Sequence, residues 1–245
     1  MRLDLFMTSE GITSSRTEAK SFILAGAVTV NGKPVTKAAL DVSPTDKVEV
    51  NRESKRYVSR GGLKLEWALR FFDLSVTGAS ALDVGASSGG FTDCLLQFGA
   101  REVVAVDSGY GQIAESLRED GRVTVIENYN ARYMKPEDLP FTPTVAVMDV
   151  SFISATHIIP AVYECLAFGG DYILLVKPQF EVGRGGIGKG GIVKDDKLRH
   201  AALERVIEFG RDSGFSFIAK TTSPIEGGDG NIEYLVHFRK EKPGI

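Results

Sequence analysis

The sequence lacks long apolar runs and contains little cysteine. None of its 245 residues lies in a stretch approaching the roughly 18 consecutive apolar residues of a membrane-spanning helix, so we expect no membrane partner. The N-terminus carries Asp4 and Glu10 and has no apolar signal-peptide core. Cys94 and Cys165 are isolated, which argues against a disulfide scaffold or a zinc site. These features predict a cytoplasmic protein without a bound metal.

The charge is distributed unevenly along the chain. Residues 1–60 contain ten Lys/Arg and seven Asp/Glu, a net charge of +3, whereas the whole chain has a net charge of −3. A basic N-terminal segment before an acidic body favours a polyanionic partner for that segment. Random scatter of surface charge explains these numbers equally well, so the charge alone does not decide between the two.

Residues 1–52 predict a small α+β domain with two short helices and a small sheet. Ser15 and Glu18 have the spacing of a capping box at the start of the second helix, and Gly26 is placed to end it. Asn31-Gly32 is a favoured two-residue hairpin turn between strands that alternate apolar and polar residues. Local sequence therefore specifies helix, helix and hairpin in that order.

This segment resembles an S4 domain, a family that binds structured RNA. The resemblance rests on Arg2-Leu3-Asp4, Ser15-Arg16, Ala19, Ile23, Gly26 and Val28 to Gly32. Arg16 and Lys20 lie one helical turn apart and project from the same face. A purely structural module accounts for the glycine and the turn but not for this basic pair. The resemblance implies that Arg16 and Lys20 contact RNA.

A polar, basic connector follows, and we expect a linker at residues 53–60 before a second domain at 61–245. Arg56 and Arg60 in this connector are further candidate RNA contacts. The helix beginning near Gly62 is expected to bury Leu63, Trp67, Ala68 and Phe71 on one apolar face. Lys64 lies on that same side, where a lysine either extends to solvent or points into a site.

The remainder of the chain alternates short apolar runs with helical or loop segments, which predicts a parallel sheet covered on both faces. The runs are ALDV, VVAVD, VTVIE, TVAVMD and YILLVK. Two further runs, FSFIAKT and IEYLVHF, are too close together for a helical crossover and are expected to pair antiparallel. The predicted fold is α/β and Rossmann-like, with an antiparallel last strand, preceded by the small α+β domain.

A glycine-rich loop directly follows the first strand of this second domain. It reads Asp83-Val-Gly85-Ala-Ser-Ser-Gly89-Gly90 and precedes the predicted helix FTDCLLQFG. Glycines allow a tight turn and a close approach to a ligand. Asp107 ends the next strand, where a carboxylate can accept hydrogen bonds from ribose hydroxyls. Because the loop lacks the G-x-G-x-x-G spacing for a pyrophosphate, it favours S-adenosylmethionine over a dinucleotide.

A second glycine-rich segment, residues 183–189, matches G-x-G-x-x-G and nearly matches a phosphate-binding P-loop. It does not join a strand tightly to a helix, since the next convincing helix begins near Asp195. We interpret it as a basic flap through which Arg184 and Lys189 contact the substrate backbone.

Polar residues at strand ends predict the site. Asp149 and Lys177 each follow an apolar strand, and ligands of open α/β sheets bind beyond the carboxyl ends of strands. Glu233 opens the last strand and reaches the same edge if that strand is antiparallel. Lys64, on the helix before the first strand, can reach it too. Each residue alone is readily explained as a strand cap, whereas four at one edge predict a catalytic site.

This set resembles the Lys-Asp-Lys-Glu tetrad of FtsJ-like ribose 2′-O-methyltransferases. With the S4-like segment, the whole chain resembles the TlyA-type rRNA methyltransferases, a group also labelled haemolysin-like. Supporting segments are SRGGLKL at 59–65, DVGASSGGFTDCLL at 83–96, MDVSFIS at 148–154 and VKPQFE at 176–181. The resemblance implies Lys64, Asp149, Lys177 and Glu233 as catalytic residues and a cytidine ribose in ribosomal RNA or ribosomal subunits as the substrate.

The same resemblance implies a set of cofactor-binding residues. They are Asp83, Gly85, Ala86, Ser87, Gly89, Gly90, Asp107, Asn130 and Asp149. The family segment Glu-Arg-x-Asn-x-Arg is here Glu127-Asn-Tyr-Asn130-Ala-Arg132, so one arginine is replaced by Asn128.

A ribose hydroxyl is a weak acid, so methyl transfer to it needs a general base, and Lys177 is our candidate. Three alternatives remain open. A haemolysin would need a membrane-inserting segment. An RNA-binding protein without catalytic activity would transfer no methyl group. Base methylation typically uses an Asn-Pro-Pro-Tyr-like motif or a cysteine nucleophile, and the sequence has no such motif.

Overall fold

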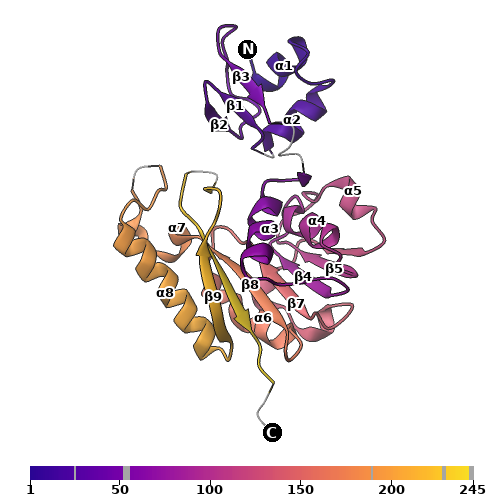
Figure 1. The fold of residues 1–245 in the computed structure, drawn as a ribbon, viewed down its shortest axis with the longest axis vertical. Coiled ribbons are helices and arrows are strands. Elements are labelled where there is room, and N and C mark those ends of the chain that lie inside the picture. The colour runs from indigo at the N-terminus through magenta and orange to yellow at the C-terminus, as the bar shows by residue number, and fades with distance from the viewer. Residues whose placement is uncertain (25, 52–55, 189, 228–229, 243–245) are drawn as a thin grey trace. The chain divides into compact units, whose positions relative to one another are not determined.

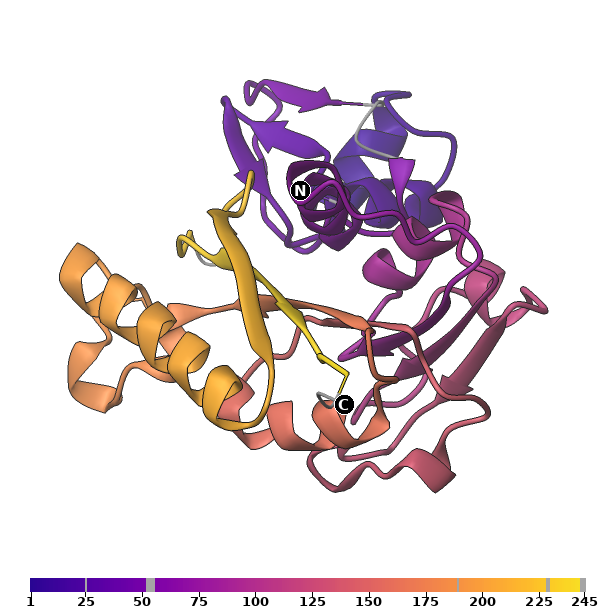
Figure 2. The same ribbon diagram turned by 60° about the horizontal axis from the view of Figure 1, so that its bottom comes forward.

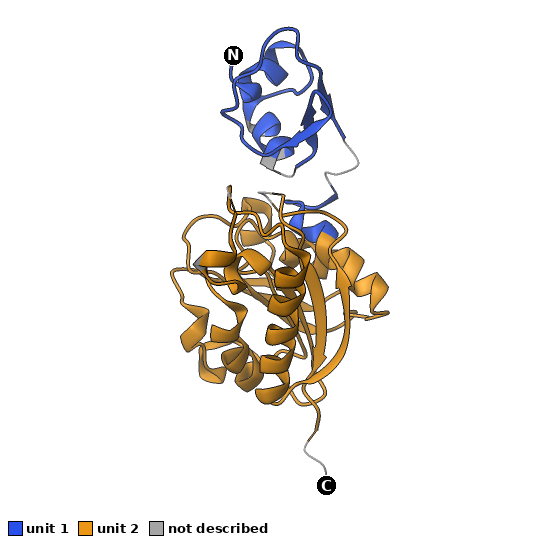
Figure 3. Ribbon diagram, turned by 90° about the vertical axis from the view of Figure 1, so that its left-hand side faces the viewer, with its two compact units in different colours: residues 1–63 blue, residues 64–245 orange. Residues whose placement is uncertain are grey.

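The computed structural model describes the chain except residues 25, 52–55, 189, 228–229 and 243–245. It contains two compact units, residues 1–63 and residues 64–245 (Figure 3). The linker predicted at 53–60 comes just before this division and lies partly outside the described residues.

The N-terminal unit contains two helices against a three-stranded antiparallel sheet in the order β2-β1-β3 (Figure 1). Its elements are α1 (Leu3–Ser9), α2 (Arg16–Leu24), β1 (Val28–Val30), β2 (Lys33–Val35) and β3 (Val48–Val50). Leu3, Met7, Phe22, Ile23 and Val28 are buried together between helices and sheet. Burial of these apolar side chains is the main stabilisation available to so small a unit.

Local chemistry explains the turns of this unit, with one correction. Asn31 and Gly32 both have positive φ, 52° and 75°, as a type I′ hairpin turn requires. Gly26 follows α2 with φ of 69°, as predicted. Ser15 Oγ accepts a hydrogen bond from the Glu18 backbone N–H at 3.1 Å. The Glu18 carboxylate, however, accepts from Ser14 N at 2.7 Å, so the expected reciprocal bond is displaced by one residue.

The C-terminal unit is built on a seven-stranded sheet in the order β6-β5-β4-β7-β8-β10-β9. Its strands are β4 (Ser80–Val84), β5 (Glu102–Val106), β6 (Val123–Ile126), β7 (Val145–Met148), β8 (Asp171–Val176), β9 (Ser216–Thr222) and β10 (Tyr234–Arg239). The first five pair in parallel, and β10 is antiparallel to both β8 and β9. The predicted α/β fold with an antiparallel last strand is confirmed.

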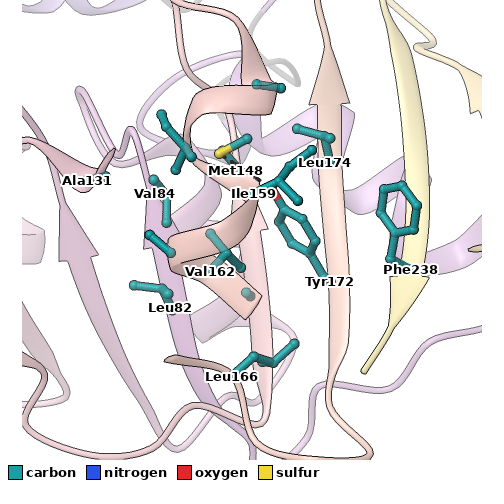
Figure 4. Packing of buried hydrophobic residues seen from close by; sticks show 14 of the residues in the cluster. Leu82, Val84, Ala131, Met148, Ile159, Val162, Leu166, Tyr172, Leu174 and Phe238 are labelled. Atoms are coloured by element: carbon teal, nitrogen blue, oxygen red, sulfur yellow. Dashed lines mark hydrogen bonds between the residues drawn. The ribbon is translucent and has the colours of Figure 1, made fainter. Parts of the chain in front are cut away.

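Helices cover both faces of this sheet. On one face, alternate strand residues such as Leu82, Met148 and Tyr172 pack against Ile159 and Val162 (Figure 4). The helices on that face are α6 (Ile159–Cys165) and α8 (Asp196–Asp212), and in Figure 2 the orange α8 lies at the left of the picture. Further helices are α3 (Gly61–Phe71), α4 (Gly90–Gln97), α5 (Glu115–Arg118) and α7 (Pro178–Glu181). Burial on both faces explains why the parallel strands are almost wholly apolar.

The buried face of α3 differs from the prediction. Trp67 and Phe71 are 41% and 53% exposed and stack on each other with ring centroids 6.0 Å apart. Ala68 is buried as expected and Leu63 is half-buried, whereas Leu65 and Leu69 are buried in place of the two aromatic residues, together with Lys64. The buried side of the helix is therefore rotated from the expected one. Large apolar residues occur on both sides of the helix, so packing against the rest of the unit decides which side is buried. Of the two orientations expected for Lys64, the structure shows the inward one.

Candidate functional site

The glycine loop between β4 and α4 is sterically constrained. Gly85 has φ of +82°, and a Cβ there would lie 2.6 Å from the Asp149 carbonyl oxygen. Gly89 has φ of +91°, and its Cβ would lie 2.3 Å from Leu117 Cδ1. Ser87 also adopts a left-handed conformation, with φ of 48°. Only glycine lets the loop pass this close to the end of β7, as the sequence predicted for a ligand-binding turn.

A cavity of about 490 Å³ opens beside this loop, at the carboxyl ends of β4, β5 and β7. Pockets of about 300–1,000 Å³ are typical of small-ligand sites. The predicted residues that line it are Gly85, Ser87, Asp107, Asn130 and Asp149. Other lining residues include Gln112, Tyr129, Ser151, Phe152, Ile153 and Ile158. Ala86, Gly89 and Gly90 shape the loop without lining the cavity.

Asp107 is oriented by the backbone on two sides of this cavity. Its carboxylate oxygens accept hydrogen bonds from Ser87 N at 2.7 Å and from Gly109 N at 2.6 Å. The side chain is therefore fixed by one N–H from the glycine loop and one from the turn after β5. Charge-assisted bonds of this kind hold a carboxylate in one orientation while leaving lone pairs available to a ligand.

Asp83 lies beneath the loop and is fully buried. Thr92 Oγ1 donates a hydrogen bond to one of its oxygens at 2.6 Å, while Oδ1 has no partner among the described residues. Burial raises the pKa of Asp83 to about 7, because a charged carboxylate is poorly solvated there. Asp83 does not line the cavity. It was predicted to bind the cofactor, and from this position it can act only by supporting the glycine loop.

Lys177 and Asp149 form an ion pair at the edge of the cavity. Lys177 Nζ lies 2.5 Å from Asp149 Oδ1 and donates a hydrogen bond to Ser151 Oγ at 2.8 Å. Lys177 follows β8, and the Asp149 backbone N–H is bonded to the Val84 carbonyl at 3.0 Å, at the end of β4. Three adjacent strand ends therefore contribute to one polar cluster.

Lys64 and Glu233 form a second pair, which is buried. Lys64 Nζ lies 2.5 Å from Glu233 Oε2, and the side chains are 7% and 2% exposed. The Glu233 carboxylate is closely enclosed, since a Cβ on Gly227 would lie 2.4 Å from Glu233 Oε1. A buried charge requires such a partner, because removing an unpaired charge from water costs on the order of several kcal/mol.

The strand register brings the two pairs to the same edge of the sheet. Tyr234 of β10 pairs with Val176 of β8, so Glu233 and Lys177 extend the register by one position. The predicted antiparallel direction of β10 is what returns Glu233 to the carboxyl ends of the parallel strands. Of the four residues, Asp149 lines the cavity, Lys177 contacts Asp149, and the Lys64–Glu233 pair lies at the same edge of the sheet without lining the cavity.

Comparison with known proteins identifies the family. An FtsJ-like methyltransferase model matches residues 57–240, and an S4 domain model matches residues 1–48. The chain belongs to the FtsJ-like methyltransferase family. The predicted methyltransferase activity and dependence on S-adenosylmethionine are thereby confirmed.

Full-length relatives of this FtsJ-like methyltransferase carry two kinds of name. Hemolysin A of Brachyspira hyodysenteriae is 48% identical over 97% of this chain and 99% of its own length. A Mycobacterium tuberculosis protein named 16S/23S rRNA (cytidine-2′-O)-methyltransferase TlyA is 43% identical, over 98% of this chain and 90% of its own. A solved hemolysin-named structure from Streptococcus thermophilus has a TM-score of 0.79 and 44% identity, covering 99% and 89% of the respective chains.

Ser151 and Phe152 are among the cavity-lining residues that sequence reasoning missed. Ser151 contacts Lys177, and Phe152 is 91% exposed at the cavity with φ of 65°. A phenylalanine rarely adopts positive φ, and the ring of Phe180 lies 5.2 Å from that of Phe152, centroid to centroid. The segment Asp149-Val-Ser-Phe-Ile153 follows a strand directly, which was the available clue to its position at the site.

The predicted RNA-binding residues have different surroundings. Arg16 forms an ion pair with the buried Asp4 at 2.9 Å, and Arg2, which was not predicted, pairs with the same carboxylate at 3.0 Å. These two arginines hold the pKa of Asp4 well below its ordinary value. Lys20 is exposed.

Further along the chain, Arg56 lies over the Tyr57 ring at 5.6 Å from its centroid, and Arg60 is half-buried. The Arg184 side chain and Lys189 lie outside the described residues. Their predicted RNA contacts remain predictions.

Cysteine burial, metal-binding groups and helix length bear on the remaining sequence expectations. Both cysteines are buried, and burial raises the pKa of Cys165 to about 12, which disfavours a thiolate nucleophile. Across the described residues, no group of His, Cys, Asp and Glu has metal-binding geometry. Within the same residues, every helix is too short or too polar to span a bilayer.

Proposed function

We propose that this protein transfers a methyl group from S-adenosylmethionine to the 2′-hydroxyl of cytidine in ribosomal RNA. The observation that carries the proposal is the pairing of Lys177 with Asp149 beside the cavity, backed by the Lys64–Glu233 pair. The Mycobacterium tuberculosis relative is named for this reaction on 16S and 23S rRNA. A ribosomal RNA substrate places the activity in the cytoplasm.

The residues of the cavity fit the cofactor. Gly85 keeps the loop free of a Cβ that would collide with the Asp149 carbonyl, and Asp107 presents a fixed carboxylate to the ribose hydroxyls. Ser87 and Asn130 line the same cavity. When bound, S-adenosylmethionine supplies the methyl group on a sulfonium leaving group.

The chain's own residues provide orientation and proton transfer. In its neutral amine form, Lys177 takes the proton of the 2′-hydroxyl at Nζ. The ammonium that results pairs with Asp149 and donates a hydrogen bond to Ser151, which fixes the direction of that nitrogen. The buried Lys64–Glu233 pair sets the electrostatic surroundings at the start of β10. In-line transfer then depends chiefly on holding the hydroxyl opposite the methyl group.

The N-terminal unit supplies RNA affinity in this proposal. Arg2 and Arg16 share one buried carboxylate, so their guanidinium groups are held in place and carry a net positive charge between them. Guanidinium groups in fixed positions suit phosphate oxygens.

The proposal is tested by methyl transfer from labelled S-adenosylmethionine to 16S and 23S rRNA, both free and in ribosomal subunits. Labelled 2′-O-methylcytidine is expected with the wild-type chain and not with Lys177→Ala. Label on a base would contradict the proposed ribose specificity. Leakage of lipid vesicles, measured in parallel, tests the activity suggested by the name of the Brachyspira relative.

A further inference from the structure

Glu181 links the two chain segments that make the Lys177–Asp149 pair. It is the last residue of α7, the short helix that begins directly after Lys177. Its carboxylate accepts hydrogen bonds from Ser154 Oγ at 2.6 Å and from the Ala155 backbone N–H at 2.8 Å. These two donors terminate the segment 149–155, which begins at Asp149. Glu181 therefore connects the Lys177 side of the site to the far end of the Asp149 segment.

Segment 149–155 contacts both the cavity and the core, since Val150 and Ile153 pack against the core and Ala155 is buried in it. Residues 149–153 all line the cavity, and Phe152 within them has φ of 65°, an unfavourable conformation for a side chain. Ser151, which receives the Lys177 hydrogen bond, lies in the middle of the segment. At its start, the segment is held by the Asp149 backbone bond to Val84. A strained loop keeps one conformation only when its surroundings hold both ends.

The backbone of Glu181 is itself held in place. The Arg205 side chain, from α8, donates a hydrogen bond to the Glu181 carbonyl oxygen at 2.7 Å. Phe180, the preceding residue, lies against the Phe152 ring. The backbone of α7 is thus bonded to α8, and its Phe180 side chain contacts Phe152 in the cavity wall.

We infer that Glu181 is a positioning residue, which holds the 149–155 wall of the cofactor cavity and thereby the Ser151 contact to Lys177. The part of this inference that concerns Lys177 and methyl transfer rests on the proposed function. The effect of Glu181 on the cavity wall does not require RNA or methyl transfer. Loss of the carboxylate releases Ser154 and Ala155, so that Val150 to Ile153 move away from the cofactor and from Lys177.

The test uses the full chain with Glu181→Ala, Glu181→Gln and Ser154→Ala. Glu204→Ala is the matched control, because Glu204 is a half-exposed carboxylate on the same unit, ion-paired with Lys220. S-adenosylmethionine affinity is measured by calorimetry. Glu181→Ala is expected to weaken it about tenfold or more, the scale of a lost charge-assisted hydrogen bond. Glu181→Gln retains an acceptor for Ala155 N and is expected to recover most of the affinity.

Two further readouts separate positioning from general stability. Ser154→Ala is expected to cost less affinity when added to Glu181→Ala than when made alone, since the Ser154–Glu181 hydrogen bond is lost in either variant. The pH midpoint of single-turnover methyl transfer is expected to shift in Glu181→Ala, at saturating cofactor and RNA, and not in Glu204→Ala. Affinity equal to that of Glu204→Ala in both Glu181 variants would overturn the inference, as would additive losses with Ser154→Ala. Wild-type binding of cofactor without any RNA methylation would instead overturn the proposed function.

Discussion

Lys64 and Glu233 are 169 positions apart in the chain, and their side chains form a buried ion pair with Nζ and Oε2 2.5 Å apart. Lys64 lies on α3, before the first strand of the sheet, and Glu233 directly precedes β10. The pair therefore joins the beginning of the C-terminal unit to its last strand.

Removing one partner of this pair is expected to destabilise the unit. Glu233→Ala leaves an unpaired buried ammonium and is expected to lower the free energy of unfolding by about 3–5 kcal/mol. The double variant Lys64→Met with Glu233→Leu is expected to be more stable than either single variant. Trp67, the single tryptophan, lies on α3 and reports urea unfolding by fluorescence. Equal stability of Glu233→Ala and wild type would show that the ammonium reaches solvent.

Asp107 is expected to contribute to cofactor affinity. Asp107→Ala removes the proposed ribose acceptor and frees Ser87 N and Gly109 N, so S-adenosylmethionine binding is expected to weaken by about 1–3 kcal/mol. Calorimetry on the full chain measures this change. Asp120→Ala is the control, because Asp120 is ion-paired with Arg122 outside the cavity lining. Unchanged affinity in Asp107→Ala would remove Asp107 from the cofactor site.

Lys177 is expected to act as the proton acceptor. Lys177→Ala is expected to reduce single-turnover methyl transfer by about 10²–10⁴-fold, with cofactor affinity nearly unchanged. Lys177→Arg keeps the charge next to Asp149 but holds its proton at any working pH, so it is not expected to restore activity. The wild-type rate is expected to rise with pH and then level off. Near-normal rates in Lys177→Arg would make Lys177 an electrostatic positioner only.

Arg16 and Lys20 are expected to contribute phosphate contacts. Replacing both by alanine is expected to weaken RNA binding and to reduce the log–log salt slope by up to roughly 0.9 per lost contact with duplex-like RNA. Filter binding across a salt series measures the slope. Lys47→Ala is the control, since Lys47 is exposed in the same unit and paired with Glu49. An unaltered slope in the double variant would move the RNA contacts to other basic residues, Arg56 and Arg60 among them.

Asp83 is expected to make stability fall as pH rises. Its pKa is about 7 in the folded protein because burial disfavours the charged form, whereas an unfolded aspartate titrates near 3.9. Between these values the folded chain holds a proton that the unfolded chain has lost, so raising the pH favours unfolding. From pH 5 to pH 8 this amounts to about 2–3 kcal/mol.

The comparison variant for this effect is Asp83→Asn, which carries no titratable proton. Urea unfolding at both pH values is expected to show a smaller loss of stability in Asp83→Asn than in wild type. Parallel pH dependence in the two proteins would mean that Asp83 is ionised and compensated in the folded state.

Local features of the sequence determined most of the fold. Asn31-Gly32 forms the hairpin turn, Gly85 and Gly89 adopt the positive φ of the ligand loop, and Asp195 caps α8 as its predicted start. Each of these depends on a residue's own backbone preference or on a partner within a few positions. Such preferences act before any tertiary contact exists and are therefore legible in the sequence.

Tertiary structure decided the contacts between distant segments. Which face of α3 is buried, and with it the Lys64–Glu233 pair, follows from the packing of that helix, because Trp67 and Phe71 are as apolar as the residues that were buried instead. The contact of Glu181 with Ser154 and Ala155 likewise depends on β8 lying beside β7. The sequence placed the charged residues at strand ends, but their partners were chosen by strand order and helix rotation, which minimise buried unpaired charge over the whole unit.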